Sequence, residues 1–240
     1  PENYHKLILE NTTKLCKIGD EELPSDINSE VKNIADNLNI GYYYKETSVH
    51  SSIKDHKGNF NSNPKCRLIN PSKSELRKVS KIILDNINES LRSKLNVNQW
   101  INSASVINWF SSINNKSDHT FLSFDIVEFY PSINEKRLDD VIIWAKSLIK
   151  IPDDEITIIK YARKSLLFSN DKTWVKNRDQ YLLDVTMGSY DGAEVCELAG
   201  LFLLNKLTDR FGRDTITILR HGGGGEAWSR LNAKAAARNT

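Results

Sequence analysis

Cysteine and long apolar runs are both scarce in this sequence, and each scarcity argues against a class of protein. The three cysteines, Cys16, Cys66 and Cys196, form no Cys-x-x-Cys pair, and the five histidines show no ligand-like spacing. A zinc site and a disulfide framework are therefore not expected. The pattern instead fits a protein of a reducing compartment. No apolar run approaches the roughly 20 residues that span a bilayer, and no signal-peptide pattern opens the sequence. We expect an intracellular protein with no membrane partner.

Net charge is also small, at +2 over 240 residues, but it is unevenly distributed. From Lys45 to Lys94 the sequence has 11 Lys and Arg against 5 Asp and Glu. A basic segment of this kind is compatible with a polyanionic partner such as nucleic acid. A solvated helix face explains the same charges, and composition leaves both explanations open.

Helical periodicity is clearest after Ser72 and Glu75, which form a capping-box pattern. Apolar residues then recur at spacings of three and four, which predicts one long amphipathic helix. Its expected core positions are Leu76, Val79, Ile82, Ile83, Ile87, Leu91 and Leu95.

Three more helices are expected further along the chain. A second capping-box pattern, at Ser132 and Glu135, opens a helix that extends to about Ile149. Pro152 and the acids after it open another, which we expect to reach about Phe168. The run "GSYDGAEVCELAGLFLLNKL" has a turn marked by glycine and then an apolar helix.

Strand periodicity is clearest in "TFLSFDI", where apolar residues alternate up to Asp125. A carboxylate at the end of a buried strand is held rigidly and can bind Mg²⁺. An isolated acid in this position is also a common turn former or cap. Tyr130 then lies close to whatever the metal holds, or it is an ordinary core aromatic.

These segments carry a resemblance to a known family. "FLSFDIVEFYPSI" resembles the first catalytic motif of reverse transcriptases, an aspartate followed five residues later by an aromatic. The resemblance implies that Asp125 binds two Mg²⁺ ions and that the backbone carbonyl of Ile126 contacts metal. It also implies that Tyr130 lies under the sugar of the incoming nucleotide and disfavours ribonucleotides.

Two other segments look like further motifs of the same family, in the expected order. "SIKDHKGNFNSNPKCRLINPSKSE" is similar to the fingers motif, in which Arg67 and either Lys54 or Lys57 would hold the triphosphate. A guanidinium offers phosphate a planar fork and a lysine a compact charge, although surface charge on a hairpin explains them too. "TMGSYDGAEVCELAG" is similar to the second palm motif, with Met187 and Gly188 at the nucleotide, although a glycine before a helix is most often a loop hinge.

The resemblance implies an α+β fold of polymerase-type fingers and palm, with a small antiparallel palm sheet backed by helices and no thumb. The sheet would carry "TFLSFDI" and "TITIL". We expect a helical extension of the fingers at 1–44, a fingers-like segment at 45–120 and a partial palm at 121–219. The implied partners are an RNA or DNA template with its primer and deoxynucleoside triphosphates.

The sequence departs from the family after "TITIL". Two aspartates are expected there, but His221 and Gly222 stand in their place. One carboxylate cannot position two divalent ions about 4 Å apart, so we expect little or no polymerase activity. The tail at 220–240 is rich in Gly and Ala and is treated as foreign to the fold. Three explanations of this composition stay open: a flexible linker with a helical end, a fusion scar, or translation in a shifted reading frame.

Three functions remain open from sequence. The chain could be a reverse-transcriptase domain that is inactive as it stands. It could be a non-catalytic nucleic-acid-binding protein that uses its basic segment and long helix, with binding that weakens as salt rises. It could also be a degenerate retroelement copy without a function.

Overall fold

The computed structural model describes the backbone of most of the chain from position 73 onward and of shorter pieces before it. The described residues are 16–18, 29, 32–33, 36–37, 44–45, 50–53, 66–69, 73–96, 99–100, 103–124, 126, 129–164, 167–169, 172–176, 185, 188–211, 216–221 and 232–238.

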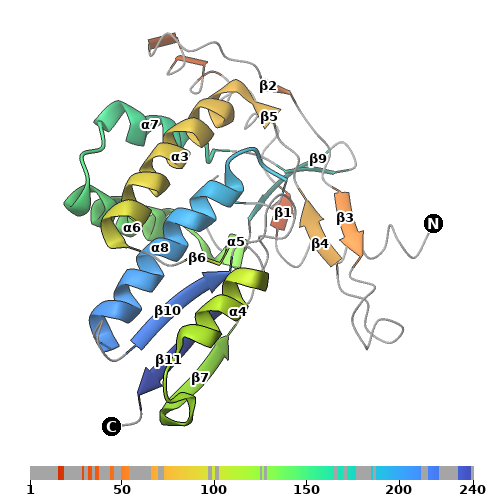
Figure 1. The fold of residues 1–240 in the computed structure, drawn as a ribbon. Coiled ribbons are helices and arrows are strands. Elements are labelled where there is room, and N and C mark those ends of the chain that lie inside the picture. The colour runs from red at the N-terminus through yellow and green to blue at the C-terminus, as the bar shows by residue number, and fades with distance from the viewer. Residues whose placement is uncertain are drawn as a thin grey trace. The chain divides into compact units, whose positions relative to one another are not determined.

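The packed body of the described chain is helical: 80% of it is helix, and no strand or sheet forms part of it. The predicted α+β fold, with an antiparallel palm sheet backed by helices, is therefore wrong. Among the residues whose burial is described, the buried apolar side chains come from helices and connecting loops. The helices are α3 (Glu75–Leu95), α4 (Ser103–Ser112), α5 (Phe129–Ser132), α6 (Glu135–Leu148), α7 (Asp153–Tyr161) and α8 (Gly192–Phe211), with a short 3-10 turn, η1 (Lys116–Asp118) (Figure 1).

The chain divides into two compact units, each made of separate stretches of sequence. Unit 1 comprises Pro1–Leu84, Asn134–Lys136 and Ile151–Ala193. Unit 2 comprises Asp85–Ile133, Arg137–Lys150 and Glu194–Thr240. The domain boundaries expected from sequence stay predictions.

Short strands accompany the helical body and are described by their backbone. In unit 1, β1 (Cys16–Ile18), β9 (Lys172–Lys176) and β8 (Leu167–Ser169) form one sheet, and two antiparallel pairs complete the set. These pairs are β2 (Tyr44–Lys45) with β5 (Lys73–Ser74), and β3 (His50–Ile53) with β4 (Cys66–Ile69). The β3–β4 pair is the hairpin that "SIKDH" and "KCRLI" predict.

The strands of unit 2 differ from the expected palm sheet in order and direction. Their order is β6 (Gln99–Trp100), β10 (Ile216–His221), β11 (Asn232–Arg238) and β7 (His119–Phe124). β6 runs parallel to β10, so the set is mixed rather than antiparallel. β11 lies between the two strands that the palm was expected to contain, pairing with both. It comes from the tail, where one interpretation expected a helix, and its extended backbone shows that this interpretation is wrong.

Helix α3 confirms the clearest periodicity in the sequence, with two exceptions. Val79, an expected core position, is only half-buried. Leu76, Ile83, Ile87, Leu91 and Leu95 are buried, as expected. Ile82 is instead 63% exposed, and Leu84, which the pattern omitted, is fully buried at 0%. The buried face of α3 is therefore rotated about the helix axis relative to the expected face, away from Ile82 and toward Leu84.

Two helix boundaries also differ from expectation. Ser132 is the last residue of α5, and its hydroxyl donates to the carbonyl of Phe129 at 2.7 Å, so α6 begins at Glu135 without the predicted cap. α7 ends at Tyr161 rather than near Phe168. Phe168 lies in β8, whose pairing with β9 is a long-range contact that local periodicity does not reveal.

The described helices were also tested for the ability to span a membrane. Among them, none combines the length and the apolar content that a bilayer crossing needs.

Candidate functional site

The predicted site residues fall partly outside the part of the chain that the structure describes. Arg67 lies on β4, where its backbone pairs with Ser52 of β3, and nothing is described of its side chain. The roles predicted for the charged residues near this hairpin therefore stay predictions. The predicted site residues outside the described ranges are Lys54, Lys57, Asp125 and Met187.

Two predicted site residues of unit 2 are described, and one of them is deeply buried. Ile126 is half-buried. Tyr130 lies on α5 and is only 6% exposed. Burial raises the pKa of its hydroxyl above the usual range, and electrostatic interactions with Cys196 and Glu194 raise this pKa further. The phenol therefore stays protonated, and its surroundings are those of a core aromatic.

Gly188 is a predicted site residue that lies in a turn before α8. It is exposed and has φ 92°, in the left-handed region, where a side chain would cost about 1–2 kcal/mol. The turn that follows is closed by the amide of Gly192, which donates to the carbonyl of Ser189 at 3.5 Å. A backbone without a Cβ is therefore presented to solvent directly before α8.

A buried ion pair anchors this turn within unit 1. Asp191, at the end of the turn, pairs with the guanidinium of Arg163, and both side chains are fully buried. Arg163 follows the end of α7, where Arg77 of α3 donates its Nε proton to the carbonyl of Ala162 at 2.9 Å. These contacts tie the turn, the end of α7 and the start of α3 together, so the conformation of Gly188 is supported from inside the unit.

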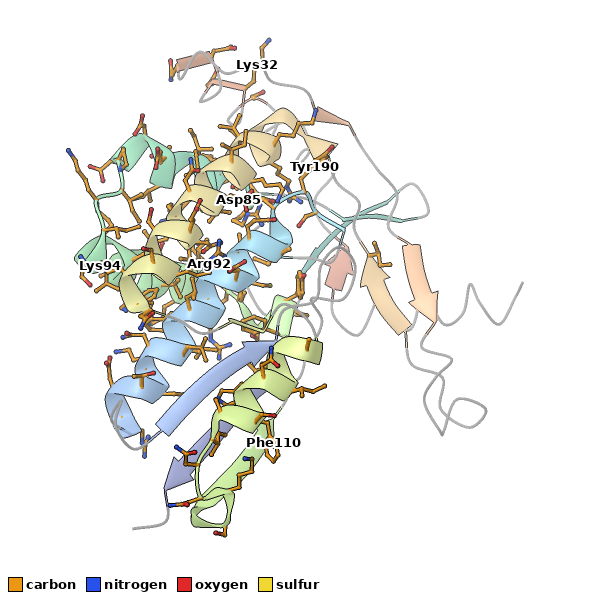
Figure 2. All side chains as sticks on the ribbon, in the orientation of Figure 1. Lys32, Asp85, Arg92, Lys94, Phe110 and Tyr190 are labelled. Atoms are coloured by element: carbon orange, nitrogen blue, oxygen red, sulfur yellow. The ribbon has the colours of Figure 1, made fainter. Side chains whose placement is uncertain are left out.

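An aromatic side chain two residues after Gly188, and a lysine that contacts it, lie on the surface of unit 1. Tyr190 is exposed (Figure 2), and the ammonium nitrogen of Lys78 lies 5.8 Å from the centre of its ring. A flat ring offers a stacking surface to a base, and a lysine offers a charge to phosphate. We call Gly188, Tyr190 and Lys78 the turn surface.

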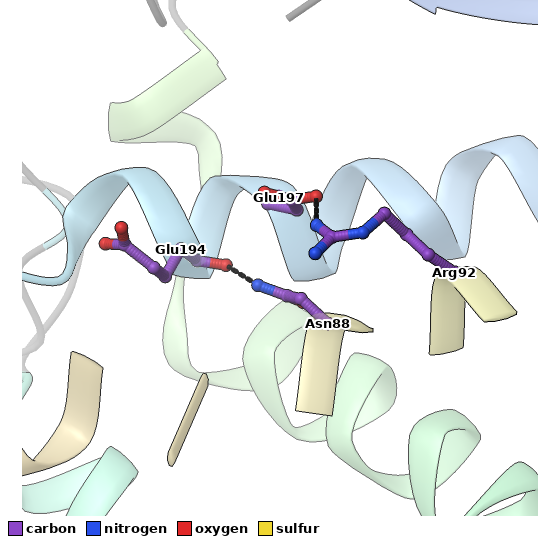
Figure 3. A network of polar contacts seen from close by, with 4 residues as sticks. All are labelled: Asn88, Arg92, Glu194 and Glu197. Atoms are coloured by element: carbon purple, nitrogen blue, oxygen red, sulfur yellow. Dashed lines mark hydrogen bonds and ion pairs between the residues drawn. The ribbon is translucent and has the colours of Figure 1, made fainter. Parts of the chain in front are cut away.

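A second polar arrangement, in unit 2, fixes α3 against α8. The side-chain amide of Asn88 donates to the backbone carbonyl of Glu194 at 3.0 Å, and Arg92 forms an ion pair with Glu197 (Figure 3). Asn88 is almost fully buried and Arg92 is half-buried, so these contacts set the register of the two helices. These contacts hold α3 and α8 together, and they add no group to the turn surface.

The magnesium ions implied by the resemblance do not fit the residues present. β10 ends at His221 and is followed by Gly222, where the family carries carboxylates. Asp125 alone does not supply the oxygens that two divalent ions need. Among the described residues, no group of three or more His, Cys, Asp or Glu could hold a metal ion.

Sequence reasoning found one member of the turn surface and missed the others. Tyr190 and Asp191 lie inside the quoted motif, but a tyrosine and an aspartate in a turn carry no specific signal. Lys78 and Arg163 lie on other elements, and only the fold brings them to this turn.

Comparison of the sequence with models of known protein families gave no match, and comparison with curated proteins gave none either. The likeness to reverse transcriptases therefore rests on the sequence motifs alone.

Proposed function

We propose that the chain is a reverse-transcriptase-related protein that contacts nucleic acid through the turn surface but does not extend primers. The observation that carries the proposal is Gly188, exposed in a left-handed conformation beside Tyr190 and Lys78. This is the position that the second palm motif assigns to nucleotide or template contact.

The chemistry of the turn surface suits a nucleotide unit. The ammonium of Lys78 attracts a phosphate oxygen, and the ring of Tyr190 accepts a base or sugar against its face. Gly188 allows the ligand to approach the backbone because no Cβ stands in the way. The buried pair of Arg163 and Asp191 holds the turn in place before the ligand arrives, which reduces the entropy lost on binding.

We expect no polymerase activity because two carboxylates of the family's third motif are missing after β10. Phosphoryl transfer depends chiefly on positioning and on electrostatic stabilisation by two metal ions. With His221 and Gly222 at the end of β10, the second set of metal ligands is lacking at this strand. The chain would then bind nucleic acid without incorporating nucleotides.

The first test is primer extension with Mg²⁺ on an RNA and on a DNA template. We expect the chain and its Asp125→Asn variant to give the same background incorporation, because the single carboxylate does not complete a two-metal site. An active polymerase on the same primer–template controls for the assay. Robust extension that Asp125→Asn abolishes would refute the absence of polymerase activity.

The second test measures binding to the turn surface by fluorescence anisotropy with a labelled single-stranded oligonucleotide. Tyr190→Ala should weaken binding about tenfold, because stacking on an aromatic contributes about 1–3 kcal/mol per base. Lys78→Gln should lower the slope of log K against log salt by about 0.7, the value for one lost phosphate contact on a single strand.

A matched pair on α8, in unit 2, provides the control for this binding test. The ammonium of Lys206 lies 5.5 Å from the centre of the Phe202 ring, so it repeats the same interaction away from the residues that anchor the turn. Phe202→Leu and Lys206→Gln should leave binding unchanged. Equal losses from both pairs would show that the effect is not specific to the turn surface and would contradict the proposal.

A further inference from the structure

Helix α4, in unit 2, presents large apolar side chains to solvent. Phe110 is 44% exposed (Figure 2). Ile107 is 63% exposed and lies three residues earlier, a spacing that puts both residues on one side of the helix. Contiguous apolar side chains on a surface can form an interaction site, whereas single ones are common on any protein.

A lysine is held at the end of this helix, against the exposed ring. The ammonium nitrogen of Lys116 lies 5.3 Å from the centre of the Phe110 ring and donates to the carbonyl of Ile113 at 2.8 Å. Ile113 itself follows the helix and donates its amide to the carbonyl of Phe110 at 3.3 Å. The charge is therefore fixed beside the ring instead of moving freely at the end of a long side chain.

The sequence around α4 has an unusual charge pattern. From position 90 to position 117 it contains no aspartate or glutamate. Of its three basic residues, Arg92 is paired with Glu197, and Lys94 donates to the carbonyl of Leu148. Lys116, with Asp118 two residues further on, is therefore the charge at the end of α4. The exposed polar side chains around the end of α4 include the amides of Asn108, Asn114 and Asn115. Amides of this kind both donate and accept hydrogen bonds, as base edges do.

We propose that α4 and the turn after it form a second contact for single-stranded nucleic acid, with a base stacked on Phe110 and a phosphate at Lys116. The proposal rests on the proposed function in assuming that the chain binds nucleic acid, but it uses residues outside the turn surface. Stacking platforms flanked by cations are how proteins hold single strands without reading their sequence.

Charge complementarity favours nucleic acid over a protein as the occupant of this face. A purely apolar partner helix would gain from Ile107 and Phe110 but not from a fixed ammonium beside the ring. A polyanion gains from both, because the flexible strand can place a base on the ring and the adjoining phosphate at Lys116.

The test uses a labelled oligothymidylate and the full chain, with anisotropy as the readout. Phe110→Ala should weaken binding about tenfold. Phe110→Leu should weaken it similarly, because leucine keeps apolar surface but has no ring, whereas Phe110→Trp should retain or strengthen binding. Lys116→Gln should lower the salt slope by about 0.7. Ile143→Ala, which removes an equally exposed isoleucine from α6, is the matched control and should change nothing.

The outcomes separate this inference from the proposed function. If the unmodified chain binds no oligonucleotide at low salt, both fail. If it binds and Tyr190→Ala weakens binding while Phe110→Ala does not, only the α4 contact is overturned. If Phe110→Leu binds as well as the unmodified chain, the face is apolar rather than stacking, and the inference is again overturned. Sedimentation of the same variants detects self-association, and a dimer that Phe110→Ala dissociates without loss of oligonucleotide binding also overturns it.

Discussion

Asp191→Asn is expected to lower the free energy of unfolding by about 3–5 kcal/mol, the usual effect of removing one partner of a buried ion pair. The side chains of Asp191 and Arg163 are both fully buried, so solvent does not screen the charge that remains. The Nε and Nη1 of Arg163 have no hydrogen-bond partner among the described residues. Within the described part of the chain, no second acceptor is therefore in place to take over from the carboxylate.

Urea unfolding followed by circular dichroism measures this change. Asp209→Asn is the matched control, since Asp209 lies on the exposed side of α8 and contacts Asn205 on the surface; it should shift stability by less than about 0.5 kcal/mol. The double variant Arg163→Met with Asp191→Leu should be more stable than Asp191→Asn, because it leaves no unpaired charge in the interior. Equal small effects of Asp191→Asn and Asp209→Asn would mean that Asp191 is solvated in the folded protein.

Asp191→Asn should also weaken oligonucleotide binding at the turn surface. Because Asp191 ends the turn that begins at Gly188, loss of the pair should loosen the turn and weaken oligonucleotide binding even where the protein stays folded. A merely global destabilisation would leave the affinity of the folded fraction unchanged. Measuring binding well below the unfolding transition distinguishes the two.

Local patterns in the sequence predicted the helices better than the sheets. Spacings of three and four located α3, because a helix buries one side of itself whatever lies opposite. A capping-box pattern located α6, and a turn marked by glycine before an apolar run located α8. The sheet of unit 2 could not be predicted in this way, since β11 pairs with β7 and β10 through residues far apart in sequence. The strand "NAKAAAR" contains no β-branched or aromatic residue, so its composition does not predict a strand.

The candidate site shows the same division between local and distant information. Gly188 was predicted from a glycine that precedes an apolar helix, and its positive φ is a local property. The partners that give the turn its rigidity and charge, Arg163 and Lys78, come from α7 and α3. No spacing in one sequence relates those positions to the turn, so only the fold reveals them.

The second large effect is expected from Leu84→Ala, which should cost about 2–5 kcal/mol because it leaves a cavity at a fully buried position. Ile82→Ala, two residues earlier on the same helix, should change stability by less than about 0.5 kcal/mol, since Ile82 is mostly solvent-exposed. Any loss of apolar contact there is offset by the higher helix propensity of alanine. Both variants remove an aliphatic side chain of the same size, so their difference reports which face of α3 is buried.

Helix geometry explains why this pair is informative. Two residues along an α-helix are about 200° apart around its axis, so Ile82 and Leu84 cannot both face the core. The sequence placed Ile82 inside because the apolar run at 82–84 is ambiguous and because polar residues were excluded from the core. Arg77, Ser80 and Asn88 are in fact buried with Leu84, and they shift the buried face away from Ile82. Urea midpoints and slopes of both variants settle the orientation: comparable losses, or a larger loss for Ile82→Ala, would mean that α3 is rotated from the position described.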